Sequence, residues 1–259
     1  MKKTSKASHT NSKTIDYYES DPAIRGLVHM HLGFPSKSML DLIPLESTAY
    51  FSTLTRTIKD VATNKTSLLD LGCGIGRLTL ELSSFFEKSI GIDLSLRLVD
   101  LANNIRDNGW SVLHQFADID SSIWKSKLLV EFDPGKVIFL RDDVLTYLKK
   151  AIEKEQLFSC VCLLNLICRV ENPKYLLKKA MKVVENKGLL VVSTPYTFPC
   201  DSKYNNMTEE EIEQDLFLFL DKDECFKIVT IAEIPFFFPD YGRRFYVVRP
   251  KIRIYQKHS

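Results

Sequence analysis

The stretch that most constrains the fold of this chain is residues 67–77, which read Ser-Leu-Leu-Asp-Leu-Gly-Cys-Gly-Ile-Gly-Arg. An apolar run ends in Asp70, and three glycines follow at alternate positions. A segment of helical composition, residues 77–86, comes next, and a second apolar run, residues 89–93, ends in another acid. A strand, a glycine-rich turn, a helix and a second strand ending in a carboxylate form the unit that builds a nucleotide pocket in doubly wound α/β folds.

The spacing of the glycines indicates which nucleotide this pocket holds. They are Gly72, Gly74 and Gly76, with Asp70 before them, whereas the dinucleotide fingerprint is G-x-G-x-x-G with pyrophosphate at the helix N-terminus. The pattern resembles the first motif of class I S-adenosylmethionine-dependent methyltransferases. Their ligand has no phosphate, so a carboxylate near the loop can face its cationic methionine end, which an anionic pyrophosphate would disfavour. A dinucleotide site or a purely structural glycine turn is the alternative.

Residues at other strand ends complete the expected cofactor site. Asp93 should accept hydrogen bonds from ribose hydroxyls. Asp143, or else its neighbour Asp142, ends the third expected strand, where this fold usually holds the adenine amino group; capping the next helix is the alternative role. Asn165 follows the fourth strand and should face the methyl group, whose in-line transfer depends on positioning and on a dry site. The predicted cofactor-binding residues are Asp70, Gly72, Cys73, Gly74, Gly76, Asp93, Leu94, Asp143, Val144 and Asn165.

The apolar pattern predicts a Rossmann-like α/β fold: a seven-stranded, mostly parallel sheet with helices on both faces. The expected strands are residues 67–71, 89–93, 136–140, 158–164, 189–193, 226–232 and 243–255, the last with a proline at 250 that limits its pairing. The expected helices are residues 77–86, 94–108, 144–155, 172–184 and 207–220, with Ser95 as an N-cap candidate of the second. A turn at residues 186–188 should lead into the fifth strand. Residues 16–65 should form a helical cap over the cofactor, with helices at 23–31 and 38–61. Residues 109–135 form an insert before the third strand that is long for a compact connection.

The length fits one domain, residues 16–259, after a disordered tail, residues 1–15. The resemblance of the glycine-rich motif implies that this domain is a methyltransferase. The net charge of +2 gives no reason to expect nucleic acid as a partner, and no apolar run approaches the length of a membrane helix. The tail lacks the apolar stretch of a secretory signal, and no pair of C-x-x-C units indicates a zinc site. We therefore expect a cytoplasmic enzyme with a small-molecule substrate, reduced thiols and no metal. Its oligomeric state does not follow from the sequence.

Aromatic and cationic side chains should gather near the carboxyl edge of the sheet, where a methyl acceptor would bind. An arginine can pair with a substrate carboxylate through two hydrogen bonds, and a tyrosine can bind or deprotonate an acceptor. Residues 165–169 lack the Asn/Asp-Pro-Pro-Tyr/Phe pattern of DNA and protein amino-group methyltransferases, which argues against those substrates. Each residue taken singly could instead serve packing or lie on the surface. The predicted substrate-binding residues are Tyr18, His31, Arg169, Tyr196, Tyr241 and Arg243.

Nearly the whole folded chain, residues 18–255, resembles a narrower family, the 4-mercaptohistidine N-methyltransferase domain of ovothiol synthases. The matching segments are Tyr18-Glu-Ser-Asp21, Met30-His-Leu-Gly33, Asp70 to Arg77, Gly91-Ile-Asp-Leu-Ser95, Glu131-Phe-Asp-Pro134, Asn165-Leu-Ile167 with Arg169, Ser193-Thr-Pro-Tyr-Thr197, and Ile234-Pro-Phe236 with Arg243. The resemblance implies methylation of an imidazole nitrogen of 4-mercaptohistidine, a step of ovothiol biosynthesis, with S-adenosylhomocysteine as the second product. It implies Asn165, Tyr196 and Arg243 as the catalytic candidates.

The chain departs from that family at two places near the expected acceptor. Cys168 stands where the family usually carries Asp, and residues 200–207 contain no Trp-Leu-Gly-Gly-like block. A related histidine derivative, another small molecule or a histidine within a peptide is therefore an alternative acceptor. A cofactor-binding module without catalysis is the alternative of a different class.

Overall fold

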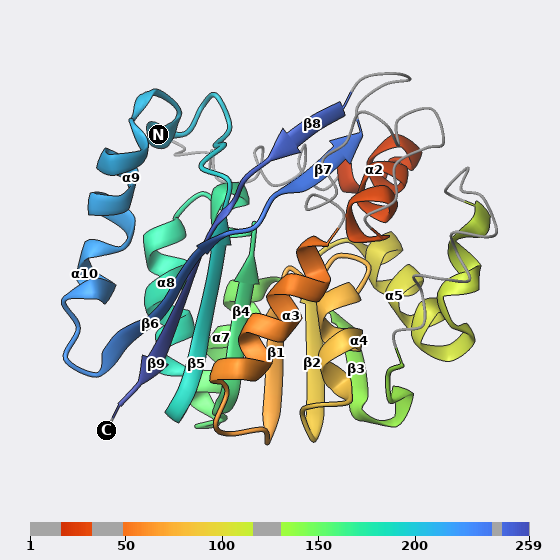
Figure 1. Cartoon of the computed structure of the whole chain (residues 1–259), viewed down its shortest axis with the longest axis horizontal. Helices are drawn as coiled ribbons and strands as arrows, with labels where there is room; N and C mark the ends of the chain where they lie inside the picture. The colour runs from red at the N-terminus through yellow and green to blue at the C-terminus, as the bar shows by residue number, and fades with distance from the viewer. Residues whose placement is uncertain (1–16, 33–48, 116–130, 240–244, 259) are drawn as a thin grey trace, which may run out of the picture.

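The structure is a computed structural model that describes residues 17–32, 49–115, 131–239 and 245–258. Its central sheet consists of β1 (Ser67–Leu71), β2 (Lys88–Asp93), β3 (Val137–Arg141), β4 (Phe158–Leu164), β5 (Val184–Thr194), β6 (Phe226–Glu233) and β9 (Lys251–Lys257). The strands lie in the order β3-β2-β1-β4-β5-β9-β6 (Figure 1). Only β9 runs antiparallel to its neighbours in this sheet, β5 and β6. The predicted seven-stranded, mostly parallel α/β fold is therefore confirmed.

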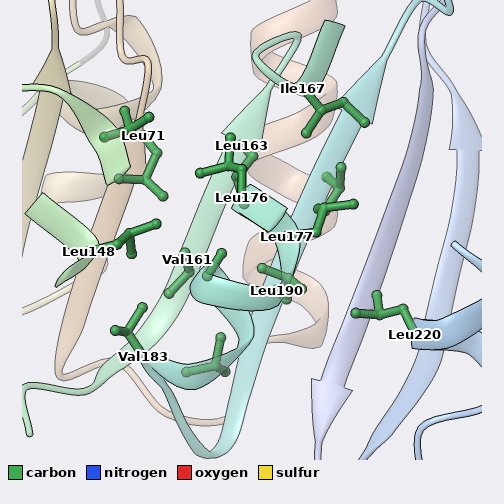
Figure 2. Packing of buried hydrophobic residues seen from close by; sticks show 14 of the residues in the cluster. Leu71, Leu148, Val161, Leu163, Ile167, Leu176, Leu177, Val183, Leu190 and Leu220 are labelled. Atoms are coloured by element: carbon green, nitrogen blue, oxygen red, sulfur yellow. The ribbon is translucent and has the colours of Figure 1, made fainter. Parts of the chain in front are cut away.

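Helices cover both faces of this sheet, as a sheet of largely apolar parallel strands requires. One face carries α7 (Val144–Glu153), α8 (Pro173–Lys182), α9 (Glu209–Leu216) and α10 (Leu218–Asp221), and Figure 2 shows part of this core. The other face carries α3 (Tyr50–Val61), α4 (Arg77–Ser83) and α5 (Leu96–Asn108). Alternation along β1 divides its side chains between the two cores, since Leu69 and Leu71 join the first and Leu68 the second.

Side-chain caps fix where four of these helices begin, including α9, which Thr208 caps. The Ser95 hydroxyl accepts a hydrogen bond from the Leu98 N–H at the start of α5, which confirms the expected cap. Asp143 caps α7, and Asn172 caps α8 in the same way. Because β2 and β3 pair in parallel, the strand ends that precede α5 and α7 lie at one edge of the sheet, where the functional side chains were expected.

A second, two-stranded sheet consists of β7 (Phe236–Pro239) and β8 (Phe245–Val248), and it lies beside α2 (Asp21–Leu32) (Figure 1). The single last strand expected at residues 243–255 was wrong, because β8 and β9 are separate strands. Pro250 lies between them, and it has no N–H to donate to a continuous ladder.

The start of the fifth strand also differs from the prediction. β5 begins at Val184, so the turn expected at residues 186–188 lies inside the strand. A register irregularity opposite Phe158 and Cys160 and a positive φ of 61° at Lys187 accommodate these residues. The insert contributes two short 3₁₀ helices, Trp110–Gln115 and Pro134–Lys136. The described residues leave out the tail, residues 38–48 of the helix expected at 38–61, and the middle of the insert.

Within the described ranges, none of the helices combines the length and the apolar character that crossing a membrane requires. In the same part of the chain, no group of three or more His, Cys, Asp or Glu side chains is placed to hold a metal ion.

Candidate active site

The glycine-rich loop between β1 and α4 depends on left-handed backbone at three positions. The φ angles are 74° at Gly72, 57° at Gly74 and 80° at Gly76, a region that side chains disfavour. A Cβ atom on Gly76 would lie 2.6 Å from Cε1 of Phe139 on β3, which is closer than van der Waals contact. Both the backbone conformation and the packing of this loop against the sheet therefore require glycine.

Asp93, at the end of β2, ties this loop to the next turn. Its Oδ2 accepts the Gly74 N–H at 2.9 Å, and its Oδ1 accepts the Ser95 N–H at 3.0 Å. Burial raises the pKa of Asp93, although these N–H groups act in the opposite direction. Because each carboxylate oxygen has two lone pairs, Asp93 can still accept hydrogen bonds from a ligand.

Asp70, the second acid of the motif, is 2% exposed on β1. The Thr79 hydroxyl of α4 donates to its Oδ2 at 2.7 Å. Burial raises the pKa of Asp70 to about 7, and the nearby Asp93 charge adds to this effect. Two desolvated carboxylates close together favour a cationic ligand, since a positive charge would stabilise both in their ionised forms.

Asp143 and Asp142 both hold hydrogen bonds within the chain. Asp143 Oδ1 accepts the Thr146 N–H at 2.8 Å, which is the helix-capping role that was the alternative to adenine binding. Asp142 Oδ2 accepts from Lys150 Nζ at 2.7 Å. Val144, the first residue of α7, is buried in the core at this edge. The prediction that Asp143 contacts a nucleotide therefore depends on its second carboxylate oxygen.

His31, near the end of α2, lies against the glycine-rich loop. A Cβ atom on Gly74 would lie 3.2 Å from its Nε2, and its ring stacks on Phe51 of α3 with centroids 4.8 Å apart. Burial, aided by the Arg77 guanidinium, lowers the pKa of His31 to about 3, so the imidazole is neutral. Its Nδ1 is buried without a hydrogen-bond partner among the described residues.

Tyr18 lies near the ends of both β2 and β4. Burial raises the pKa of its hydroxyl, while Arg169 lowers it and Cys168 and Asp93 raise it. Two of the predicted substrate-binding residues, Tyr18 and Arg169, are thus close enough to interact electrostatically. Arg169 is exposed, directly after the buried Cys168. Tyr241 and Arg243 lie outside the described residues.

Asn165 begins the turn after β4, with a positive φ of 53°. Its Oδ1 accepts a hydrogen bond from the Ser193 hydroxyl of β5 at 2.9 Å, and the Ser193 oxygen lies 3.2 Å from the Tyr50 hydroxyl of α3. Its backbone carbonyl accepts the Cys168 thiol at 3.2 Å. A chain of buried polar groups therefore fixes this residue at the carboxyl end of the sheet.

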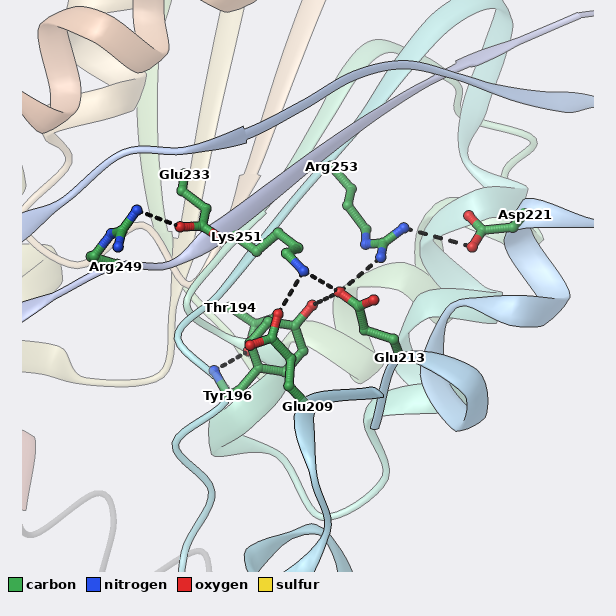
Figure 3. Close-up of polar contacts among 9 residues, drawn as sticks. All are labelled: Thr194, Tyr196, Glu209, Glu213, Asp221, Glu233, Arg249, Lys251 and Arg253. Atoms are coloured by element: carbon green, nitrogen blue, oxygen red, sulfur yellow. Dashed lines mark hydrogen bonds and ion pairs between the residues drawn. The ribbon is translucent and has the colours of Figure 1, made fainter. Parts of the chain in front are cut away.

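Tyr196 has a different partner from the acceptor expected for it. Its hydroxyl donates to Glu213 Oε1 of α9 at 2.7 Å (Figure 3). Lys251 and Arg253 of β9 each contact the same carboxylate oxygen at 2.8 Å. Burial and the Glu213 charge raise the pKa of Tyr196. The side chain is thus part of an ion-pair cluster that joins α9 to β9, and its hydroxyl is not free to act as a base.

A family profile described as a methyltransferase domain matches residues 45–230, which is most of the chain. The chain belongs to this methyltransferase domain family. The ubiquinone biosynthesis O-methyltransferase, mitochondrial, of Dictyostelium discoideum is 28% identical over 129 residues, 49% of this chain and 35% of that protein. The match therefore spans about a third of the length of that curated relative.

Solved structures of methyltransferases share the fold of this methyltransferase. Magnesium protoporphyrin IX methyltransferase from Synechocystis PCC 6803 with bound SAM aligns over 98% of this chain and 100% of its own, with a TM-score of 0.56 and 14% identity. The same enzyme with bound SAH gives a TM-score of 0.57 at 15% identity, over 96% of this chain and 99% of its own. At these identities the likeness establishes the fold alone.

Sequence reasoning missed two polar residues of this methyltransferase, Tyr50 and Ser193. Tyr50 falls only within the helix expected at residues 38–61, and Ser193 ends the expected fifth strand and begins the resembling segment at residues 193–197. Their contact joins positions 143 residues apart, and the helical spacing of Tyr50 carries no signal for a polar partner. The ionisable cluster around Glu213 was missed for the same reason.

Proposed function

We propose that this methyltransferase uses S-adenosylmethionine to methylate an imidazole nitrogen of 4-mercaptohistidine or a closely related histidine derivative. The observation that supports the cofactor most strongly is a pair of acids on either side of the glycine-rich loop, the buried Asp70 and the partly buried Asp93. The proposed identity of the acceptor rests on the resemblance to the 4-mercaptohistidine N-methyltransferase domain and on the residues at the ends of β4 and β5.

The residues present fit S-adenosylmethionine, which supplies an electrophilic methyl group on a sulfonium. Asp93 would accept its ribose hydroxyls with lone pairs that Gly74 and Ser95 leave unused. Asp70, desolvated and hydrogen-bonded to Thr79, would face its cationic end. His31 lies with Nε2 against the same loop, and its buried Nδ1 has no hydrogen-bond partner among the described residues, so a polar group of the cofactor that reached Nδ1 would satisfy it.

On the acceptor side, Tyr18 and Arg169 would hold the amino-acid part of the substrate, with Asn165 beside the reacting nitrogen. An arginine pairs well with a carboxylate, and Arg169 is exposed at this edge of the sheet. Arg243 and Tyr241 stay predicted substrate residues. We assign Tyr196 to the stability of the α9–β9 contact, because its hydroxyl already donates a hydrogen bond to Glu213.

A second candidate is a methyltransferase of the same fold that acts on an oxygen or on another small molecule. The name of the Dictyostelium relative as an O-methyltransferase favours an oxygen acceptor. Cys168 supports a changed acceptor too, since a buried thiol with a raised pKa carries no charge toward a substrate amine.

The proposal is tested by mass spectrometry of reactions with S-adenosylmethionine and a panel of 4-mercaptohistidine, histidine, carnosine, a histidine-containing peptide and a phenol. We expect one added methyl group on mercaptohistidine. Methylation of the phenol alone would support the second candidate, and failure to bind S-adenosylmethionine would contradict both.

The role of Arg243 is tested by Arg243→Ala, with Arg249→Ala as the matched control. Arg249 is an exposed arginine nearby in the sequence that pairs only with Glu233 among the described residues. We expect Arg243→Ala to raise the acceptor KM at least tenfold, about 1.4 kcal/mol, with S-adenosylhomocysteine affinity retained. Full activity of Arg243→Ala would remove this arginine from the substrate site.

A further inference from the structure

Tyr50, the first residue of α3, ties the N-terminal helices to one another. Its side chain is 2% exposed, and its ring packs edge-on against Phe51 and against Phe236 of β7, with centroids 5.0 and 5.2 Å away. Phe51 in turn stacks on His31 of α2. An aromatic cluster thus joins α2, α3 and β7, and we call these three elements the cap.

The hydroxyl of Tyr50 closes a ring of three polar side chains at the ends of β4 and β5. Ser193 is fully buried and donates its single proton to Asn165 Oδ1 at 2.9 Å. The Ser193 oxygen, 3.2 Å from the Tyr50 hydroxyl, is therefore left to accept the tyrosine proton. Asn165 also forms a hydrogen bond with this hydroxyl. Because the tyrosine proton is already used, the amide N–H of Asn165 is the donor, and each member of the ring donates once and accepts once.

The surroundings of the ring keep it intact. Burial raises the pKa of Tyr50 to about 12, although hydrogen bonds with Ser193 and Asn165 act in the opposite direction. The tyrosine therefore keeps, at neutral pH, the proton that the ring requires. Loss of one member would leave a buried donor and a buried acceptor without partners, which is more costly than the loss of a single exposed hydrogen bond.

Asn165 extends this anchor into the turn after β4. Its backbone N–H donates to the Ser193 carbonyl at 2.9 Å, and its own carbonyl accepts the Cys168 thiol at 3.2 Å. The side-chain amide is held at its oxygen by Ser193 and at its nitrogen by Tyr50, so it cannot rotate. The tyrosine hydroxyl, which belongs to the cap, therefore fixes one end of a side chain that belongs to the turn.

We infer that Tyr50, Ser193 and Asn165 form a latch that docks the cap onto the turn after β4, and that Tyr50 is thereby a positioning residue for methyl transfer. The positioning role rests on the proposed function, which places the acceptor beside Asn165. In this role the amide of Asn165 holds the turn in place, and the lone pair of the reacting atom stays free to attack the methyl group. The latch also connects the two halves of the site, because His31 of the cap lies against the glycine-rich loop.

The latch is tested by residue-resolved hydrogen exchange of the cofactor-free protein, with Tyr255→Phe as the matched control. Tyr255 is fully buried too, but its hydroxyl donates to Asp221 at 2.7 Å on the other face of the sheet. Amides of β1 serve as the reference for global unfolding. Relative to them, we expect Tyr50→Phe to speed exchange at the Asn165 amide, and Ser193→Ala to speed exchange in the first turn of α3, each at least tenfold.

Tyr255→Phe should change neither of these relative rates. Tyr50→Phe that leaves exchange at the Asn165 amide unchanged relative to β1 would overturn the latch. The same conclusion would follow if Ser193→Ala left the first turn of α3 unchanged, because the ring requires each partner to report on the other.

The positioning role is tested by kinetics with 4-mercaptohistidine, or with the compound of the panel that the wild type does methylate. We expect Tyr50→Phe to lower kcat three- to tenfold, with S-adenosylhomocysteine affinity within twofold of wild type. The double variant with Ser193→Ala should be no slower than the slower single variant, because both substitutions break one ring. Effects that multiply, or a kcat of Tyr50→Phe equal to that of Tyr255→Phe, would overturn the positioning role. If the wild type methylates no compound of the panel, the proposed acceptor and the positioning role fail together, whereas the exchange measurement still decides the latch.

Discussion

Replacing Gly76 with alanine should separate the two reasons for glycine in the cofactor loop. Gly76 has a φ of 80°, and Gly109, at the end of α5, has nearly the same φ of 77°. A Cβ atom on Gly109 meets nothing within 4 Å, whereas one on Gly76 lies 2.6 Å from Phe139 and 3.2 Å from Ala102. The left-handed backbone of Gly76, with a ψ of 13°, costs alanine about 1 kcal/mol, and overpacking adds about 1–3 kcal/mol. Gly109, with a ψ of 177°, lies in a region that is essentially restricted to glycine, so alanine there costs about 1–3 kcal/mol through backbone strain alone.

We expect a loss of about 2–4 kcal/mol in the free energy of unfolding for Gly76→Ala and about 1–3 kcal/mol for Gly109→Ala, measured by urea denaturation. Because roughly 1 kcal/mol lowers Tm by 2–4 °C in a chain of this size, both losses should also appear in thermal melts. Phe139→Leu should reduce the cost of Gly76→Ala and leave the cost of Gly109→Ala unchanged. An equal cost of Gly76→Ala with and without Phe139→Leu would refute the reasoning that Phe139 excludes a side chain at this position.

Three further predictions concern charged groups. Asp93→Asn should weaken S-adenosylhomocysteine binding about ten- to hundredfold by calorimetry, because charge-assisted hydrogen bonds are worth about 1.5–3 kcal/mol; a change below twofold would contradict its role. The pKa of Asp70 is about 7 in the folded protein and 3.8 ordinarily. The stability that protonated Asp70 contributes to the folded state is therefore fully present below pH 4 and is lost as the pH rises to 7. In the cofactor-free protein, Asp70→Asn should remove this decline of up to about 4 kcal/mol from the pH profile of unfolding. Glu213→Gln should lower the free energy of unfolding by about 2 kcal/mol, because it leaves the largely buried Arg253 with a weaker partner. Substitution of the exposed Glu210 with Gln should change it by less than about 0.5 kcal/mol. Equal effects of the two variants would exclude the cluster as a stabilising element.

The parts of the fold that could be predicted are those that local chemistry determines. The strand at residues 67–71 and the Ser95 cap follow from apolar runs and from a hydroxyl placed before a helix. The start of the fifth strand expected at residue 189 was wrong for a tertiary reason. Asn-Lys-Gly favours a turn, and Lys187 has a positive φ, but pairing of Val184 with Phe158 on β4 begins the strand before these residues.

The candidate site was predictable where it depends on the backbone and not where it depends on distant pairs. The glycine-rich loop and Asp93 belong to one contiguous segment, so their spacing placed them beside each other. Tyr196 lay in a segment that resembles a substrate site, yet its hydroxyl reaches Glu213 on a helix whose position no local pattern specifies. An acidic residue on an amphipathic helix is ordinarily solvent-facing, and nothing in the sequence distinguishes this one.

Asn165 supplies both a left-handed backbone position and a side-chain amide, and these two roles decide which substitution is informative. Its φ of 53° belongs to the left-handed region, where Asn and Asp are tolerated far better than other side chains. Alanine at this position would therefore combine about 1 kcal/mol of backbone strain with the loss of the amide. Aspartate keeps both the backbone conformation and an oxygen for Ser193, and it replaces the amide N–H donors with a carboxylate oxygen and its negative charge. A fall in kcat/KM for Asn165→Asp with unchanged stability would hence report on the polar group and not on the backbone, whereas the same fall in an alanine variant would not separate the two.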